Sequence, residues 1–181
     1  MAEYVALLRA INVAGHARVK MSELKKAFSA AGCRDVRTFI QSGNVVFAAR
    51  EADAGALSEG VRITLRSLLG EEPTVLFRSL REIRRLTARN PFEGFDRDGS
   101  VKLYVTFLER APELKPKLPL ISPKERLEVI GIRGCEAFIV SRRKDNGFYG
   151  FPNNFIEKEL GVVATSRNWS TVSKLASLGD A

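Results

Sequence analysis

Two polar segments, far apart in the chain, carry the side chains whose types could bind a ligand or take part in a reaction. One is Thr-Phe-Ile-Gln-Ser-Gly-Asn-Val-Val-Phe at 38–47, and the other is Thr-Ser-Arg-Asn-Trp-Ser-Thr-Val at 165–172. Each places hydrogen-bonding side chains next to a hydrophobic run, which is typical of a functional loop that a rigid scaffold positions. Neither contains an acid, base or nucleophile in an arrangement that identifies a reaction.

Thr165 and Ser166, at the start of the second segment, precede a helical pattern. The apolar residues that recur at helical spacing are Trp169, Val172, Leu175 and Ala176. They predict a helix from about 167 to 178, and the free N–H groups at its start would attract a phosphate or carboxylate. The candidate anion-binding residues here are Ser166, Arg167 and Asn168. The alternative is that Thr165 or Ser166 simply caps the helix.

The loop after the first predicted strand and the hairpin at 41–44 offer a second group of polar side chains. In a β-α-β-β-α-β sheet the first and third strands are adjacent and antiparallel, so we expect Asn12 and Asn44 to lie at the same edge. A shared polar site is then geometrically allowed, with the candidate ligand-binding residues Arg9, Asn12, Gln41, Ser42 and Asn44. The alternative is that each side chain satisfies the backbone at its own turn.

The sequence has few residues for acid–base or metal chemistry. His16 is the only histidine, and its position in a glycine-containing loop favours a solvated histidine over a general base. Cys33 and Cys135 lie far apart, so they predict reduced thiols rather than a zinc site. No Walker loop or dinucleotide fingerprint is present. We expect no cofactor and no metal, and the sequence leaves open whether the protein is an enzyme.

Length and charge limit the class of protein. The chain has 181 residues and a net charge of +8, with 11 basic and 8 acidic residues up to Arg78 and 18 and 13 after it. This spread favours an anionic small molecule or a nucleic acid as partner, and the alternative is a generally basic protein. The sequence shows no secretory signal and no apolar run near the ~20 residues of a membrane span. We expect a cytoplasmic protein with no membrane partner, and the oligomeric state is not predicted.

The hydrophobic pattern of residues 1–78 predicts a ferredoxin-like half. The predicted strands are 4–11, 36–42, 45–49 and 73–77, with helices at 21–31 and 53–70, which gives the order β-α-β-β-α-β. RNA-recognition modules share this order and stack bases on exposed aromatic rings. Their characteristic Lys/Arg-Gly-Phe-x-Phe run is missing, so we interpret Phe39 and Phe47 as core residues.

Residues 79–181 predict a second, less regular α+β half that packs closely on the first. Ser79 and Glu82 have the spacing of a capping box, and the helix they begin should end at Asn90-Pro91. A strand at 101–108, a proline-rich connector at 112–123, a hairpin of 127–132 and 137–140, and helices at 152–160 and 167–178 follow. The predicted fold class is therefore α+β, with halves 1–78 and 79–181.

Several stretches resemble the bacterial family catalogued as domain of unknown function 1697. They are Val-Ala-Leu-Leu-Arg-Ala-Ile-Asn-Val-Ala-Gly at 5–15, the segment 39–47, Asn-Pro-Phe at 90–92 and the segment 165–172. The resemblance extends over essentially the whole chain. It departs at Ala10 and Ala14, where the family usually has glycine, and at Ser170, where it commonly has asparagine. The resemblance implies a two-part α+β protein, and it implies no established activity, substrate or cofactor.

Three functional hypotheses remain open. In the first, the polar motifs line a cleft that binds an anionic ligand such as a nucleotide, phosphate or nucleic acid. In the second, the same cleft belongs to an enzyme of unknown class, whose amide and guanidinium groups stabilise a transition state. In the third, the motifs are purely structural.

Overall fold

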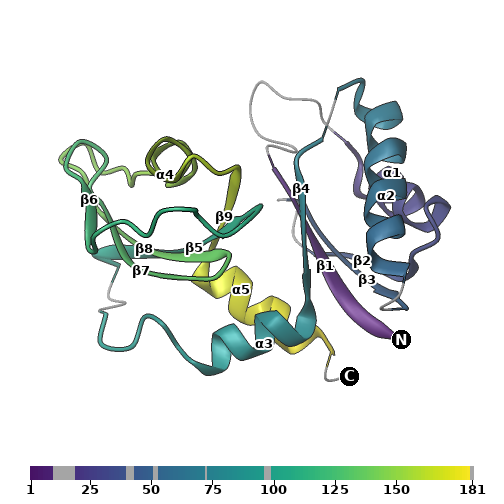
Figure 1. The fold of residues 1–181 in the computed structure, drawn as a ribbon, viewed down its shortest axis with the longest axis horizontal. Coiled ribbons are helices and arrows are strands. Elements are labelled where there is room, and N and C mark those ends of the chain that lie inside the picture. The colour runs from purple at the N-terminus through teal and green to yellow at the C-terminus, as the bar shows by residue number, and fades with distance from the viewer. Residues whose placement is uncertain (10–18, 40–42, 51–52, 72, 96–98, 180–181) are drawn as a thin grey trace. The chain divides into compact units, whose positions relative to one another are not determined.

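The computed structural model describes residues 1–9, 19–39, 43–50, 53–71, 73–95 and 99–179 (Figure 1). Its contacts divide the chain into two compact units. Unit 1 comprises residues 1–83 and 178–181, and unit 2 comprises residues 84–177. Each unit has its own antiparallel sheet accompanied by helices, which confirms the predicted α+β class.

Unit 1 has the predicted order of elements. These are β1 (Ala2–Leu8), α1 (Met21–Ala30), β2 (Arg34–Phe39), β3 (Asn44–Ala49), α2 (Ala54–Leu69) and β4 (Val75–Ser79). The strands form an antiparallel sheet in the order β2-β3-β1-β4, so the apolar β1 is a central strand beside β3. Figure 1 shows α1 and α2 on the same face of this sheet.

The core of unit 1 lies between the sheet and these two helices. Leu24 and Phe28 of α1 and Val61 and Leu65 of α2 are buried there. Phe47 of β3 is 3% exposed, and its ring centroid lies 5.7 Å from that of Phe28. A nucleic-acid base cannot stack on a ring that is covered in this way. The interpretation of Phe47 as a core residue is therefore confirmed.

The helix α3 (Leu80–Ala88) begins at the predicted capping box. Ser79 N donates a hydrogen bond to Glu82 Oε2 at 2.7 Å, and Glu82 N donates to Ser79 Oγ at 3.2 Å. These reciprocal bonds satisfy N–H groups that have no partner within the helix. The local sequence signal is enough to place this helix start.

Unit 2 is built around a five-stranded sheet. Its elements are β5 (Val101–Leu108), β6 (Leu120–Ser122), β7 (Leu127–Arg133), β8 (Glu136–Arg142), α4 (Asn153–Leu160), β9 (Ala164–Asn168) and α5 (Trp169–Ala176). The strand order is β6-β7-β8-β5-β9, with every pair antiparallel. The prediction of 112–123 as a connector was wrong in part, because β6 forms within it by pairing with β7. A short 3-10 helix, Ser177–Gly179, follows α5.

The apolar side chains of unit 2 pack on the sheet. Val129 and Ile139 are fully buried in one cluster with Ile156 of α4. Trp169, at the start of α5, is 8% exposed, and its ring centroid lies 5.2 Å from that of the buried Phe92. Trp169 therefore anchors the start of α5 in the core.

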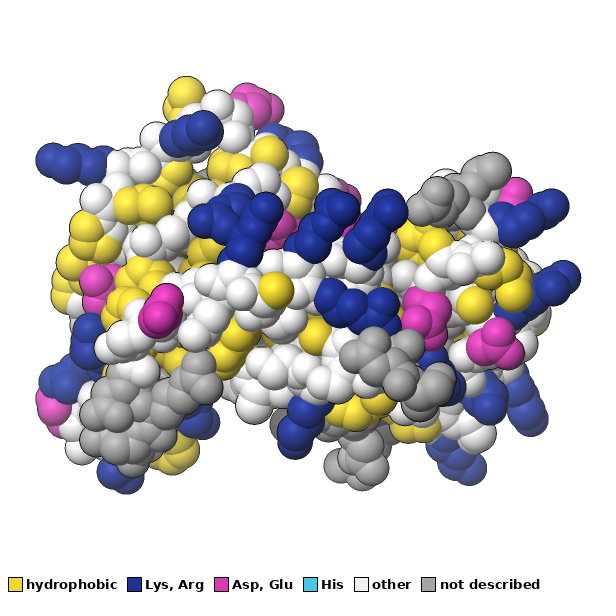
Figure 2. Space-filling model, turned by 90° about the horizontal axis from the view of Figure 1, so that it is seen from below, with side chains coloured by type: hydrophobic (Ala, Val, Ile, Leu, Met, Phe, Trp, Pro, Cys, Tyr) yellow, Lys and Arg dark blue, Asp and Glu magenta, His cyan; other side chains and the backbone are white. Residues whose placement is uncertain are grey.

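Charged side chains lie at the surface with one exception among the described residues. On the face shown in Figure 2, Lys and Arg side chains are more prevalent than Asp and Glu, in keeping with the net charge of +8. Arg167 is the exception, since it is 7% exposed. Among the helices of the described residues, none is long and apolar enough to cross a membrane.

We expect Ser79→Ala to lower the free energy of unfolding by about 1 kcal/mol, because alanine cannot accept the bond from Glu82 N. Ser67→Ala is the matched control. Ser67 Oγ donates to Ile63 O within α2, where alanine is the better helix former. Urea unfolding followed by circular dichroism measures both variants. An equal loss of stability at Ser67 would contradict the role given to the capping box.

Candidate functional site

The first polar segment meets the end of β1, as predicted. Leu7 pairs with Asn44 across the antiparallel strands, and Leu8 N donates to Gly43 O at 2.8 Å. The Asn44 side chain is fully buried, and its Nδ2 donates to Phe39 O at 3.1 Å. Asn44 thus bonds the backbone of its own hairpin, which is the structural alternative for this residue.

The other residues of this candidate site are placed only in part. Arg9 is half-buried after β1, and its N donates to Thr74 O at 2.9 Å. Asn12, Gln41 and Ser42 lie outside the described residues, as does His16. A shared polar site around Asn12 and Asn44 therefore stays a prediction.

The second polar segment differs from its predicted structure. Residues 164–168 form the strand β9, and α5 begins only at Trp169 with Asn168 as its N-cap residue. The prediction that Thr165 and Ser166 precede a helix starting near Arg167 was wrong, because these residues pair with β5. Thr106 lies opposite Ser166 in that pairing. The Asn168 side chain is exposed and makes no hydrogen bond to cap the helix.

Ser166 belongs to a buried chain of hydroxyl and amide groups. Its Oγ donates to Asn153 Oδ1 at 2.6 Å and lies 2.7 Å from Thr106 Oγ1. Because a serine hydroxyl has one proton, Thr106 must be the donor in the second bond. Ser166 and Thr106 are 4% and 0% exposed, so these bonds replace those that water would make.

Arg167 is a buried cation held by oxygen atoms of its own strand. Its Nη1 donates to Thr165 Oγ1 and to Ser166 O, both at 2.9 Å. Burial lowers the pKa of the guanidinium to about 10, because the charged form loses hydration. The group therefore stays protonated near neutral pH. Its described contacts fix the direction of the side chain within β9.

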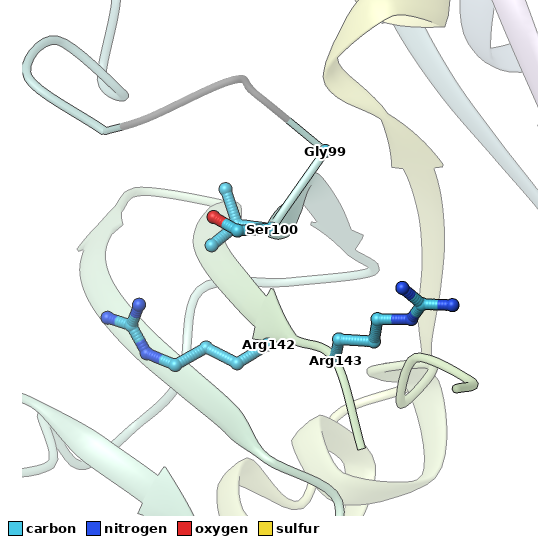
Figure 3. Close-up of a pocket in the computed structure, with 5 residues that line it drawn as sticks. Gly99, Ser100, Arg142 and Arg143 are labelled. Atoms are coloured by element: carbon cyan, nitrogen blue, oxygen red, sulfur yellow. The ribbon is translucent and has the colours of Figure 1, made fainter. Parts of the chain in front are cut away.

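A hollow of about 540 Å³ lies where β5 begins and β8 ends. Val101 pairs with Arg142 there, and we call the hollow lined by Gly99, Ser100, Val101, Arg142 and Arg143 the arginine hollow. Figure 3 shows Arg142 and Arg143 extending in opposite directions from the end of β8. Successive side chains of a strand point to opposite faces, so the two guanidinium groups cannot grip the same small anion.

The two arginines differ in how they are held. Arg142 Nη2 lies 3.2 Å from Glu128 Oε2, in an ion pair whose arginine side chain is 54% exposed. Arg143 Nε donates to Gly147 O at 3.1 Å, which is a neutral acceptor. The positive charge of Arg143 is therefore oriented by a backbone carbonyl, and the terminal nitrogen atoms of its guanidinium can donate to a ligand.

A second hollow, of about 580 Å³, lies in unit 1 beside the start of α2. Its lining includes Arg34, Arg50 and Asp53. Arg50 Nε lies 2.6 Å from Asp53 Oδ2, so a carboxylate already balances one of the two arginines of this hollow. The arginine hollow is the better candidate for an anion, because Arg142 and Arg143 are in its lining with no carboxylate among the described lining residues, whereas Asp53 lines the second hollow.

Comparison with known protein families identifies the family of this chain. Residues 1–138 match the family model described as Protein of unknown function (DUF1697). The chain belongs to this family. The matched range of the DUF1697 model includes the motifs at 5–15, 39–47 and 90–92, whereas residues 165–172 follow it. A search among curated proteins found no match.

A solved structure has the same fold as this DUF1697 protein. It is the conserved bacterial protein SP0830 from Streptococcus pneumoniae, with a TM-score of 0.60 and 18% sequence identity. The similarity covers 97% of each chain. At this identity the likeness concerns the fold alone, so the chemistry must be argued from the residues of this chain.

Sequence reasoning did not identify the arginine hollow. The loop before β5 and the charged run after β8 were both visible in the sequence, at 94–100 and 142–147. What joins them is the register that sets Val101 opposite Arg142, and these residues are 41 positions apart in the chain. The pair Arg142-Arg143, just after the predicted strand at 137–140, was the available signal.

We expect Ser166→Ala to lower the free energy of unfolding by about 1–3 kcal/mol, because Thr106 Oγ1 and Asn153 Oδ1 lose a buried partner. Ser170→Ala, at an exposed position of α5, is the control and should change stability little. Urea unfolding measures both. The double variant Thr106→Val with Ser166→Ala should cost less than the sum of the single changes. Strict additivity would show that the two hydroxyls do not act as a pair.

Gly150, in the segment that follows β8, gives a second prediction on stability. Ser141 Oγ donates to Gly150 O at 3.0 Å, and a methyl group on Gly150 would lie 2.2 Å from Glu125 O. We expect Gly150→Ala to destabilise the protein by about 1–3 kcal/mol through this overpacking.

Gly55→Ala is the control for Gly150→Ala. Gly55 lies in α2, with no atom within 4 Å of an added methyl group. The change should raise stability by up to about 1 kcal/mol, because alanine is the better helix former. Thermal unfolding of the two variants compares them directly. A stability of Gly150→Ala equal to that of the unchanged protein would show that residues 143–150 move freely away from Glu125.

Proposed function

We propose that this protein binds a phosphate-bearing ligand at the arginine hollow. The observation that carries the proposal is a hollow of about 540 Å³ lined by two exposed arginines. Its size is within the range of ligand sites, roughly 300–1,000 Å³. Arginine matches phosphate oxygens with paired N–H donors, and Gly99 and Ser100 add backbone groups and a hydroxyl to the lining.

The existing contacts of the arginines are compatible with such a ligand. The ion pair of Arg142 with Glu128 is solvent-exposed, so it contributes at most about 1 kcal/mol and a phosphate can compete with it. Arg143 needs no rearrangement, because Gly147 O already orients its guanidinium. A ligand that reaches both arginines must carry more than one anionic group, since they extend in opposite directions (Figure 3).

This proposal moves the anion site away from the motifs that first suggested it. The described bonds of Asn44 and Arg167 lie within their own hairpin or strand, and Ser166 donates to Asn153 of α4 in the interior, so these contacts favour the structural hypothesis for them. The cleft that would include Asn12, Gln41 and Ser42 stays part of the proposal as a second location for the ligand. The net charge of +8 and the expected cytoplasmic location suit a phosphate-bearing partner in either place.

Calorimetric titration with tripolyphosphate at low salt tests the arginine hollow. We expect Arg143→Gln to weaken binding roughly fivefold, which corresponds to about 1 kcal/mol. Arg133→Gln is the matched control, because Arg133 is exposed at the far end of β7 and the change in net charge is the same. Equal weakening by both variants would contradict a site at the hollow and indicate a general effect of charge. Absence of any heat of binding to the unchanged protein would contradict the proposed function.

A further inference from the structure

The loop that follows β8 begins at the arginine hollow with Arg143 and carries exposed aromatic rings. We call residues 143–151 the β8 loop. Phe148 is 73% exposed and Phe151 is 54% exposed. Between β8 and these rings the sequence carries Arg143 and Lys144, so the β8 loop has cationic side chains at its start and aromatic side chains at its end. This combination of cations and rings is the one that binds single-stranded nucleic acid, where phosphates contact the cations and bases stack on the rings.

Hydrogen bonds within the β8 loop fix the backbone position of Phe148. Lys144 N donates to Phe148 O at 2.8 Å, and Phe148 N donates to Asn146 Oδ1 at 3.1 Å. Gly147 has φ +83°, a conformation that favours glycine, and its N donates to Lys144 O at 2.9 Å. Phe148 is therefore presented to solvent on a closed turn. Because the backbone that carries the ring is already ordered, binding costs less conformational entropy than it would for an open loop.

Tyr149 joins the β8 loop to the rim of the arginine hollow. Its hydroxyl donates to Gly99 O, and Lys102 Nζ lies 4.7 Å from the centre of its ring. The lysine covers one face of Tyr149 in a cation–π contact. Phe151 packs edge-on against Tyr104, with ring centroids 5.6 Å apart. Of the three rings in the loop, Phe148 is the most exposed and is the one that can receive a base.

The charge around the hollow is positive after its carboxylates are paired. Glu125, Glu128 and Asp145 pair with Lys144, Arg142 and Arg126 respectively. Lys102 and Arg143 then add positive charge on the hollow side of the β8 loop. Asp96 and Asp98 precede Gly99 in the sequence and lie outside the described residues.

From these observations we propose that the arginine hollow and the β8 loop bind single-stranded nucleic acid. The inference rests on the proposed function and names its ligand class. Arg142 and Arg143 contact separate phosphates of one strand, because they extend in opposite directions (Figure 3). Phe148 stacks on an unpaired base. A duplex offers phosphates but keeps its bases stacked inside, so Phe148 distinguishes the two forms of nucleic acid.

Fluorescence anisotropy with a labelled oligouridine of about 12 nucleotides tests the inference. We expect Phe148→Ala to weaken binding at least fivefold, since the loss of one stacked base costs about 1–3 kcal/mol. Phe148→Tyr should restore most of the affinity. Leu114→Ala is the matched control, because it removes an apolar side chain that is 85% exposed outside the β8 loop. Arg143→Gln should reduce the slope of log K against log salt by about 0.7.

Two further measurements separate this inference from the function on which it rests. Phe148→Ala should leave tripolyphosphate binding unchanged, and a duplex of the same length should bind the unchanged protein more weakly than the single strand. If tripolyphosphate binds while oligouridine binding is absent, insensitive to Phe148→Ala or no tighter than duplex binding, the inference is overturned and the phosphate site stands. If neither probe binds, both are overturned.

Discussion

The pairing of β5 on both of its sides determines where the arginine hollow and the buried hydroxyl pair of unit 2 lie. On one side β5 pairs with β8, and this register sets Val101 beside Arg142 at the hollow. On the other side it pairs with β9, and this register sets Thr106 beside Ser166 in the interior. A slip of one residue in either pairing would move the side chains to the opposite face of the sheet. The buried hydroxyl pair therefore also protects the geometry of the sheet that carries the exposed arginines.

Arg167 and Arg143 differ in solvent exposure and therefore in their capacity to bind a ligand. Arg167 is 7% exposed, and the loss of hydration lowers its pKa while oxygen atoms of β9 hold its Nη1. These bonds of Nη1 hold the side chain along its own strand. Arg143 is exposed and is oriented through Nε alone among its described bonds, so a ligand can approach its terminal nitrogen atoms without breaking the sheet. Arg167, in the motif at 165–172, is thus less suited to binding a ligand than Arg143, in the charged run at 142–147.

Local signals in the sequence were sufficient for most of the elements. The capping box at Ser79 and Glu82 and the strand at 101–108 each depend on neighbouring residues, and each is found as predicted. The first strand also forms, but at Ala2–Leu8 where 4–11 was predicted. The strand β9 was missed because Thr165-Ser166 before an apolar helical pattern satisfies the local rules for a helix N-cap. Only the pairing with β5 shows that Thr165 and Ser166 belong to a strand and do not cap a helix. The arginine hollow was missed for the same reason, since it depends on the register of distant strands.

A buried polar strand can be inferred only together with its partners. A hydroxyl without a partner in the interior costs about 1–3 kcal/mol, so such groups are found in sets that satisfy one another. Thr106 is a polar residue within the buried part of β5, and Ser166 and Asn153 complete its set from β9 and α4. A lone hydroxyl in an apolar strand pattern therefore predicts a hydroxyl or amide on the strand beside it. Applied to this chain, that constraint would have favoured pairing of the 165–168 segment with β5 over a helix cap.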